Sequence, residues 1–316
     1  MYNQLTREQR YAIYLGLQEK KSFTAIARQI HCSVSTVSRE VRRNTNRYGH
    51  YIFQEAVELT KVRRERSVSN RRIPIHVLKE AMRLLTDEDW SPKQISGFLR
   101  KKGIRISHER IYQEIRADRT GEYRKHCRHK LKYIHHQRPK RKTAGKTLIP
   151  NRISIHERPV EADGKRFGDW EMDLVVGKAQ KSAVLTMVER STNMFFQTKV
   201  QSKQPKIVAR AAFRLLIPFK QFVKTITTDN GCEFMEHQWL AKRLDTTVYF
   251  ADPFCSGQKG AVENANKLFR QYFPKGTDFR HIDQSEMDYV QAKINRRPRE
   301  KLNFETPVKV FFNSIG

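Results

Sequence analysis

The stretch that decides the fold of the second half of this chain is Gly168-Asp169-Trp170-Glu171-Met172-Asp173-Leu174-Val175-Val176. Its apolar run predicts a strand at residues 169–177. Side chains alternate between the two faces of a strand, so Asp169, Glu171 and Asp173 share one face. Asp173 abuts the apolar run, deepest in the expected sheet, where a rigid ligand is wanted. We therefore predict Asp173 as the functional acid, with a supporting role for Glu171.

Strand-like and helix-like segments alternate from there to the C-terminus. Further strands are predicted at residues 183–190, 194–200, 223–229 and 246–250, and helices at 206–219, 238–244, 262–272 and 285–295. Three consecutive strands followed by alternating helices and strands predict an α/β domain, in which helices pack on the faces of a mixed sheet. We place this domain, with its C-terminal helices, at residues 156–316.

Two more acids stand at the ends of predicted elements. Asp229 precedes Asn230-Gly231, a turn signal that ends the strand and exposes the carboxylate at its tip. Glu263 opens a helix, and 33 residues separate it from Asp229. Converging acids from separate elements are what a two-metal phosphodiester site needs, because carboxylate oxygens bind hard divalent cations. The spare acids nearby, Glu233 and Asp252, are assigned to structural or DNA-edge positions.

The charge balance indicates the class of partner. The 316 residues include 62 Lys and Arg against 33 Asp and Glu, which makes a formal net charge of +29. A field of this size attracts a polyanion, and the release of counterions from phosphates makes such binding strongly dependent on salt. Most of the excess lies in residues 1–150, so we expect that half of the chain to make the main contacts to nucleic acid.

Residues 1–60 are predicted to form a helix-turn-helix DNA-binding domain. Helices are expected at residues 7–19, 24–30 and 34–43, with a small core of Ile26, Ala27, Ile30, Val34, Val37 and Val41. Residues 26–39 resemble bacterial helix-turn-helix repressor motifs, although His31 stands where glycine is usual; His tolerates a left-handed turn. The second helix of such motifs enters the major groove, so the candidate groove-facing residues are Ser35, Thr36, Arg39 and Arg42. A three-helix bundle without groove contacts is the alternative.

A second helix-turn-helix-like domain is predicted at residues 61–118. Ser91-Pro92-Lys93-Gln94 is a typical helix start, with Ser at the cap and Gln completing a capping box. Gly103 ends that helix, and Ser107 caps the next one. A plain helical hairpin is the alternative.

Residues 119–155 are densely basic and contain few apolar residues, which predicts a linker or a DNA-tracking arm. Within them, His126, Cys127, His129 and the pair His135-His136 suggest zinc ligation. A basic linker is favoured, because only one Cys is present and no Cys-x-x-Cys partner follows.

The chain shows neither a disulfide pattern nor a membrane segment. Its cysteines are scattered, which fits a reduced cytosol; they are Cys32, Cys127, Cys232 and Cys255. No apolar run reaches the roughly 20 residues of a membrane span. The N-terminus lacks a signal-peptide pattern, so we expect an intracellular protein.

Several sequence words together resemble the transposases of the IS-thirty insertion-sequence family, whose RNase H-like catalytic core is shared with retroviral integrases. In the second half these words are Gly-Asp-Trp-Glu-Met-Asp at 168–173, Asp-Asn-Gly-Cys-Glu-Phe at 229–234, Tyr-Phe-Ala-Asp-Pro at 249–253 and Arg-Gln-Tyr-Phe-Pro-Lys-Gly-Thr at 270–277. In the first half they are Ser-Thr-Val-Ser-Arg-Glu at 35–40 and Ile-Ser-His-Glu at 106–109. The resemblance covers nearly the whole chain and implies that the catalytic acids are Asp173, Asp229 and Glu263.

The resemblance also implies a mechanism and partners. Two Mg²⁺ ions, with Mn²⁺ as a substitute, are expected at the three acids. The expected reactions are strand cleavage by water, followed by attack of a 3′-hydroxyl on a second DNA phosphate. Lys267 and Arg270 follow Glu263 on one helix face, within reach of a DNA phosphate; for Arg270 the alternative is a salt bridge to the sheet. The expected partner is double-stranded DNA, both terminal inverted repeats and target, bound by a homo-oligomer. The implied location is cytoplasmic and nucleoid-associated in a bacterium, without membrane binding.

Three other functions compete with transposition. A transcriptional regulator with a ligand-sensing rear domain has no reason to place acids at these strand ends. A catalytically inactive relative that only binds DNA is disfavoured because all three acids are intact. A resolvase or nuclease of the same fold would lack the end-binding front domain.

Overall fold

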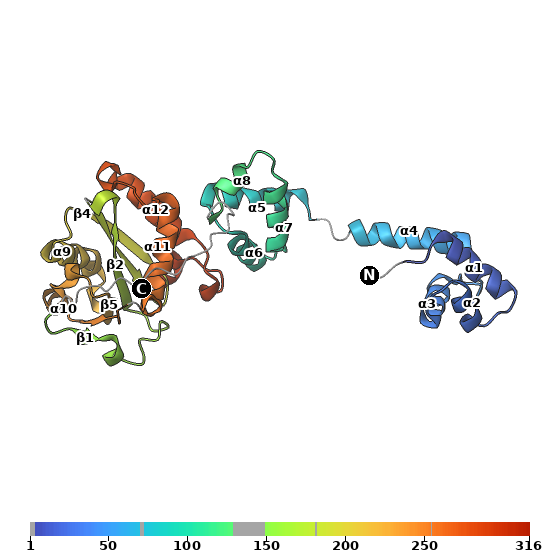
Figure 1. The fold of residues 1–316 in the computed structure, drawn as a ribbon, viewed down its shortest axis with the longest axis horizontal. Helices are drawn as coiled ribbons and strands as arrows, with labels where there is room; N and C mark the ends of the chain where they lie inside the picture. The colour runs from blue at the N-terminus through green and yellow to red at the C-terminus, as the bar shows by residue number, and fades with distance from the viewer. Residues whose placement is uncertain (1–3, 70–72, 129–148, 181, 254) are drawn as a thin grey trace. The chain divides into compact units, whose positions relative to one another are not determined.

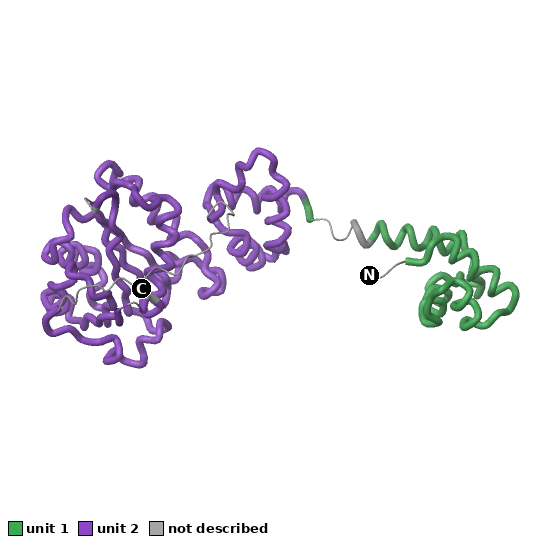
Figure 2. The backbone as a smooth tube through the Cα atoms, viewed as in Figure 1, with its two compact units in different colours: residues 1–74 green, residues 75–316 purple. Residues whose placement is uncertain are grey.

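The structure, a computed structural model, describes residues 4–69, 73–128, 149–180, 182–253 and 255–316 (Figure 1). The chain divides into two compact units, residues 1–74 and residues 75–316 (Figure 2). The finer division into four parts stays a prediction, and most of its basic linker lies outside the described residues. Within the described ranges, no helix combines the length and the apolar character needed to cross a membrane.

The first unit is built from the helices α1 (Arg7–Gln18), α2 (Phe23–Gln29), α3 (Val34–Asn44) and α4 (Phe53–Ser69). The first three begin at hydroxyl caps, because Thr6, Ser22 and Ser33 each accept a hydrogen bond from the backbone N–H three residues further on. Their apolar faces meet in a small core that contains Ile13 and Ile26. The three helices predicted for this region are therefore confirmed, with ends that differ by one residue.

The turn between α2 and α3 has the geometry of a helix-turn-helix motif. His31 has a φ of 53°, which is the left-handed conformation predicted for it. One predicted core residue is wrong, because Val34 is 43% exposed. It is the first residue of α3, and the buried side of that helix begins one turn later, at Val37.

The second unit begins with the helices α5 (Ile75–Glu88), α6 (Pro92–Lys101), α7 (His108–Ala117) and α8 (Glu122–Lys125). Ser91 and Gln94 form the predicted capping box at the start of α6. Gly103, with a φ of 77°, turns the chain after α6, and Ser107 caps α7 as predicted. Helix α5 was not predicted.

The rest of the second unit is built around a mixed six-stranded sheet with the order β1-β6-β5-β2-β3-β4. Strands β2, β3 and β4 pair antiparallel, whereas β2, β5, β6 and β1 run parallel. The strands are β1 (Ile153–Ser154), β2 (Asp169–Val176), β3 (Ala183–Glu189), β4 (Phe195–Val200), β5 (Thr225–Thr228) and β6 (Thr247–Phe250). All but the short β1 were predicted, so the α/β class with a mixed sheet is confirmed.

Helices cover both faces of this sheet (Figure 1). Trp170, Met172 and Leu174 of β2 pack in one core with α9 (Pro205–Leu216), α10 (His237–Leu244) and α13 (Pro307–Asn313). Val175, on the opposite face, packs in a second core with α11 (Gly260–Tyr272) and α12 (Gln284–Arg296). The three acids of β2 therefore lie on the face that α11 and α12 cover. Helix α9 ends before the predicted residue 219, because Pro218 lies there and disfavours a regular α-helix.

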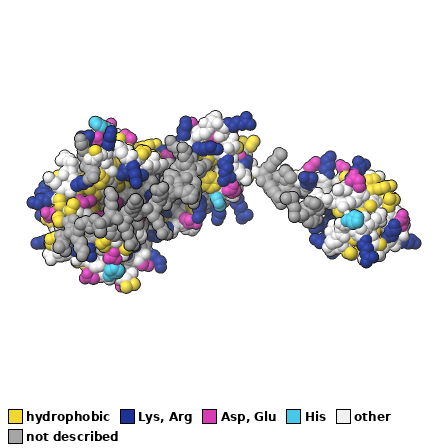
Figure 3. Space-filling model, in the orientation of Figure 1, with side chains coloured by type: hydrophobic (Ala, Val, Ile, Leu, Met, Phe, Trp, Pro, Cys, Tyr) yellow, Lys and Arg dark blue, Asp and Glu magenta, His cyan; other side chains and the backbone are white. Residues whose placement is uncertain are grey.

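Basic side chains are spread over the surface of both units. Figure 3 shows Lys and Arg side chains on the visible face of each, with acidic side chains between them. This distribution agrees with the net charge of +29.

Candidate active site

Asp169 is not available for chemistry at the strand end, although it shares a face with Asp173. Its side chain is fully buried and accepts hydrogen bonds from the Arg166 guanidinium at 2.7 and 3.0 Å and from Thr225 Oγ1 at 2.7 Å. A buried carboxylate paired in this way serves the fold. The expectation that Asp173 lies deepest in the sheet is wrong, because Asp169 and Glu171 are fully buried whereas the Asp173 side chain is 25% exposed. The assignment of Asp173 as the functional acid stays a prediction.

Glu171 connects the sheet to the helix that carries Glu263. It is 1% exposed and accepts hydrogen bonds from Arg190 Nε and from the backbone N–H of Val262, both at 2.9 Å. Val262 lies in the first turn of α11, where backbone N–H groups have no partner within the helix. Glu171 therefore fixes the start of α11 against β2, which is a supporting position.

Asp173 and Asp229 meet at a lysine. Lys259 Nζ lies 3.2 Å from Asp173 Oδ1 and 3.0 Å from Asp229 Oδ2, and the lysine side chain is 7% exposed. Burial alone would lower the pKa of this ammonium, but the two carboxylates outweigh burial and raise the pKa above its ordinary value. Two of the three predicted acids, one inside β2 and one directly after β5, are thus brought together around one cation.

Glu263 lies half-buried in the first turn of α11. Asn266, three residues further along the same helix face, donates from Nδ2 to Asp173 Oδ2 at 2.7 Å. This contact places the helix face of Glu263 toward Asp173. In the part of the chain that the structure describes, no three His, Cys, Asp or Glu side chains are grouped closely enough to hold a metal ion. Glu263 therefore lies on the helix that packs against β2, but it does not form a cluster with Asp173 and Asp229 in the described residues.

The donor set fits a divalent cation of the magnesium type. Asp173 and Asp229 offer carboxylate oxygens, which hard cations prefer, and both already face one positive charge. Asn266 Oδ1 is buried without a hydrogen-bond partner among the described groups. A buried acceptor in that state is unusual and indicates a group still to be bound.

A hollow of about 620 Å³ opens beside Asp173 and Asn266. Three basic residues line it, namely Lys203, Arg270 and Lys275. Cations next to an acidic strand end suit a nucleic-acid backbone, because its phosphates need positive partners while the acids bind metal ions.

Arg270 is tied to the backbone around this hollow. Its guanidinium donates to Val176 O at 2.9 Å, to Pro274 O at 3.2 Å and to Phe273 O at 3.4 Å. Burial lowers its pKa. Arg270 thus braces the end of β2 against the turn after α11, whereas Lys267 is exposed. Contact of either residue with DNA stays a prediction.

The predicted groove-facing residues share one side of α3. Ser35, Arg39 and Arg42 are exposed and Thr36 is half-buried. Arg39 donates to the backbone oxygen and to Oγ of Ser35, both at 3.0 Å, which orders its guanidinium along the helix. Their contacts with DNA also stay a prediction.

Asp252 occupies a structural position. It accepts hydrogen bonds from His156 Nε2 and Gln258 Nε2 at 2.8 Å, and its own N–H donates to Gln258 Oε1 at 2.7 Å. Gln258 directly precedes Lys259, so Asp252 orders the loop that leads to the site. Glu233 is half-buried next to the turn that follows Asp229.

The residues that suggested zinc have other contacts. His126 Nδ1 binds Asp89 Oδ1 at 2.8 Å, and the buried Cys127 donates to Tyr123 O at 3.5 Å. The remaining histidines of that motif lie outside the described residues. All four cysteines are free.

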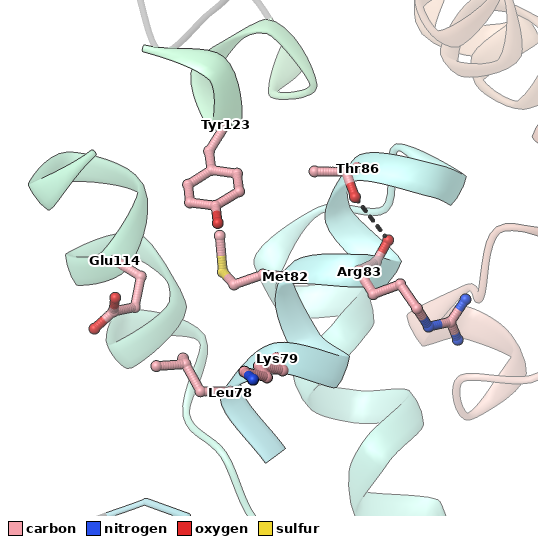
Figure 4. A pocket seen from close by; sticks show the side chains of 7 residues that line it. All are labelled: Leu78, Lys79, Met82, Arg83, Thr86, Glu114 and Tyr123. Carbon is pink, nitrogen blue, oxygen red and sulfur yellow. Dashed lines mark hydrogen bonds between the residues drawn. The ribbon is translucent and has the colours of Figure 1, made fainter. Parts of the chain in front are cut away.

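A second hollow, of about 400 Å³, lies among α5, α7 and α8 (Figure 4). Met82 and Tyr123 face each other across it, while the charged ends of Arg83 and Glu114 point away. Without converging charges, it has no arrangement for phosphodiester chemistry.

Sequence reasoning missed two residues of the site, Lys259 and Asn266. Both stand at helical spacing from Glu263, four residues before it and three after it. That spacing was the available signal, because such positions share a face with Glu263. Their contacts with Asp173 arise only through the packing of α11 on β2.

Two family models match parts of the chain. Residues 1–44 match a family model described as a helix-turn-helix domain, and residues 164–255 match one described as an integrase core domain. The catalytic core domain of BIV integrase, a solved structure, is similar with a TM-score of 0.38 and 19% identity over 47% of this chain and 95% of that chain.

Three curated relatives are similar over almost the whole chain. The transposase for insertion sequence element IS4351 of Bacteroides fragilis is 36% identical and covers 100% of this chain and 98% of its own length. The transposase for IS1086 of Cupriavidus metallidurans is 34% identical, with 98% and 94% covered. The transposase InsI for IS30A of Escherichia coli is 34% identical, with 99% and 84% covered.

A helix-turn-helix unit followed by an RNase H-like, integrase-type catalytic core defines a DNA transposase of the DDE class. The identity with relatives over the full length goes further: the chain belongs to the IS30 family of insertion-sequence transposases. It binds DNA and carries out integration, and its family membership implies the use of divalent metal ions.

Proposed function

We propose that this transposase binds the terminal inverted repeats of its insertion sequence through α3, and that it cleaves and joins DNA at Asp173, Asp229 and Glu263. The observation that supports this site most strongly is the contact of Asp173 and Asp229 with one cation, Lys259. Neighbouring carboxylates repel each other unless a cation lies between them, and their oxygens are the ligands that Mg²⁺ prefers.

The residues of the site fall into metal ligands, positioning residues and DNA-binding residues. Asp173, Asp229 and Glu263 would hold two Mg²⁺ ions, for which Mn²⁺ could substitute. Metal ions bound there would supply positive charge to the attacking and leaving oxygens. Glu171 keeps α11 in place through the N–H of Val262, and Asn266 orients Asp173. The basic residues of the hollow beside Asp173 hold the DNA strand.

We infer a division of labour along the chain. Residues 1–60 and 61–118 bind DNA, residues 119–155 follow its backbone, and residues 156–316 perform the chemistry. Joining two ends requires at least two copies, so the active form is a homo-oligomer. Its DNA substrate places it in the bacterial cytoplasm, associated with the nucleoid.

Asp229→Asn tests the catalytic half of the proposal. The variant keeps the size of the side chain but loses the charge that binds metal, so strand transfer is expected to fall below detection with Mg²⁺ or Mn²⁺. Binding to end DNA should stay within about twofold, because α3 is untouched. Cleavage and strand transfer of labelled end DNA, and gel shifts on the same preparations, measure both.

Glu233→Gln is the matched control, because it removes a nearby carboxylate to which no metal ion is assigned; it should keep strand transfer. Residual strand transfer by Asp229→Asn would refute the site. Loss of end binding together with strand transfer would contradict a purely catalytic role.

Arg39→Ala tests the binding half. Since a bidentate contact of the guanidinium with a base edge is expected, its removal should weaken binding to end DNA by about 1–3 kcal/mol and relax the sequence preference. Arg28→Ala, which removes an exposed cation from α2, should weaken binding equally for end and scrambled DNA. An unchanged preference in Arg39→Ala would remove α3 from recognition.

A further inference from the structure

Lys259 stands at the centre of the site without a part in the proposed chemistry. It is the last residue of the turn η6 (Ser256–Lys259), directly before α11, and its side chain is 7% exposed. Its ammonium lies within 3.2 Å of one oxygen of Asp173 and one oxygen of Asp229. These are two of the three carboxylates to which the metal ions are assigned.

The physical reason for a buried lysine here is the repulsion between the two acids. Two carboxylates that face each other without a counterion strongly destabilise a half-buried site, and removing one partner of a buried ion pair leaves an uncompensated charge. The ammonium supplies one positive charge, whereas Asp173, Asp229 and Glu263 together carry three negative charges. The compensation is therefore partial, and the site keeps an attraction for further cations.

We propose that Lys259 is a removable stand-in for the metal ions: it holds Asp173 and Asp229 together before the ions bind and leaves the position between them when the ions arrive. This inference rests on the proposed function of the two acids. A divalent ion has twice the charge and approaches oxygen at roughly 2.0–2.1 Å, so it displaces the ammonium. The apparent metal affinity is lowered by the fraction of molecules in which that position is occupied by Lys259.

The surroundings of Lys259 allow the displacement. Gly257 and Gly260 flank it, and a Cβ added at either glycine would meet no described atom within 4 Å. The backbone on either side of Lys259 is therefore not crowded, although Asp252 holds Gln258 by two hydrogen bonds. Asn266 keeps its hydrogen bond to the other oxygen of Asp173, so the carboxylate stays oriented while the ammonium moves.

Binding of Mn²⁺ to the full-length protein without DNA, measured by calorimetry, tests the proposal. Lys259→Met keeps the length of the side chain and removes the charge, so Mn²⁺ should bind about tenfold more tightly than to the wild type. Lys259→Arg keeps the competing charge and should bind Mn²⁺ no more tightly than the wild type. Lys242→Met, which removes an exposed lysine from α10, is the matched control and should leave the affinity unchanged.

Thermal unfolding in EDTA gives a second readout that does not depend on activity. Lys259→Met should lower the Tm, because the two carboxylates lose their counterion, and Mn²⁺ should raise its Tm more than that of the wild type. Lys259→Arg and Lys242→Met should match the wild type in EDTA. These variants separate the charge at residue 259 from a general loss of positive charge.

Wild-type Mn²⁺ affinity in a folded Lys259→Met protein, or weaker binding, would overturn the stand-in role. Asp229→Asn distinguishes this failure from a failure of the proposed function. If Asp229→Asn loses Mn²⁺ binding while Lys259→Met binds Mn²⁺ like the wild type, only the proposed role of Lys259 is contradicted. If Asp229→Asn binds Mn²⁺ fully, both the metal site and the role of Lys259 are contradicted.

Discussion

Asp169, Glu171 and Asp173 alternate with apolar residues along β2, and each lies in a different environment. Asp169 is enclosed by Arg166 and Thr225, and Glu171 binds Arg190 and the start of α11. Asp173, nearer the end of the strand, is 25% exposed and faces a lysine from another element. Residue type alone does not distinguish them; depth in the sheet and the identity of the basic partner do.

Glu171→Gln should destabilise the protein although Glu171 is not one of the proposed metal ligands. The substitution leaves Arg190 without its buried partner and places a side-chain amide next to the Val262 N–H. Removing one member of a buried ion pair costs about 3–5 kcal/mol. Chemical denaturation measures the free energy of unfolding, with the half-buried Glu233→Gln as control. A change below about 1 kcal/mol would contradict the anchoring role.

At the scale of elements, α11 joins the site to the helices α5–α8. Its first turn binds Glu171, and its last turn carries Tyr272, whose hydroxyl donates to Asp89 Oδ2 at 3.0 Å. Asp89 follows α5 and also binds Lys293 Nζ and His126 Nδ1, each at 2.8 Å. One carboxylate therefore links α5, α8, α11 and α12.

Asp89→Asn should reveal this link through the pH dependence of stability. Burial alone would raise the pKa of Asp89, but hydrogen bonds from Lys293 and His126 outweigh burial and hold it below the ordinary value of 3.8. A carboxyl with a lowered pKa stabilises the folded state above its unfolded pKa and loses that effect as the pH falls through its folded pKa. The variant should lose about 1–3 kcal/mol at pH 7, and its difference from the wild type should shrink below pH 3.8.

Denaturation of both proteins between pH 7 and pH 3 measures this difference. A difference that stays constant over the whole range would show that Asp89 acts by shape and not by charge.

The helix α6 packs against the C-terminal segment so closely that Gly97 has no room for a side chain. A Cβ at Gly97 would lie 2.1 Å from the ring of Phe304. The ion pairs of Lys101 with Glu305 and of Lys93 with Glu300 flank this contact. The ends of the second unit are thus held together by packing as well as by charge.

For the whole molecule, the basic segment with Arg138, Lys140, Arg141 and Lys142 is expected to strengthen DNA binding without selecting sequence. Replacing these four residues by Gln should reduce the slope of log affinity against log salt by about 0.9 for each phosphate that the segment no longer neutralises. The preference for end DNA over scrambled DNA should stay the same. Fluorescence anisotropy over a range of salt concentrations measures both quantities.

Lys140→Arg and Lys142→Arg keep the charge and serve as controls with an unchanged slope. A wild-type slope in the fourfold Gln variant would remove this segment from DNA binding.

Much of the architecture could be predicted because its causes are local. Ser91 and Ser107 cap helices as predicted, through hydrogen bonds that span three residues. The apolar runs of β2 to β6 predict strands for the same reason. Val34 was misassigned because periodicity does not show where a small core ends.

Most helices and strands could be read from residue types at short spacing, the excess of positive charge from composition, and the family from several motifs along the chain. Which charges meet depends on the assembled fold. Lys259 reaches Asp173 and Asp229, and Asp89 reaches Tyr272 and Lys293, through the order of strands in the sheet and the packing of α11 and α12. Electrostatic partners depend on distance in space, and residues far apart along the chain acquire that distance only when the sheet and its helices are assembled.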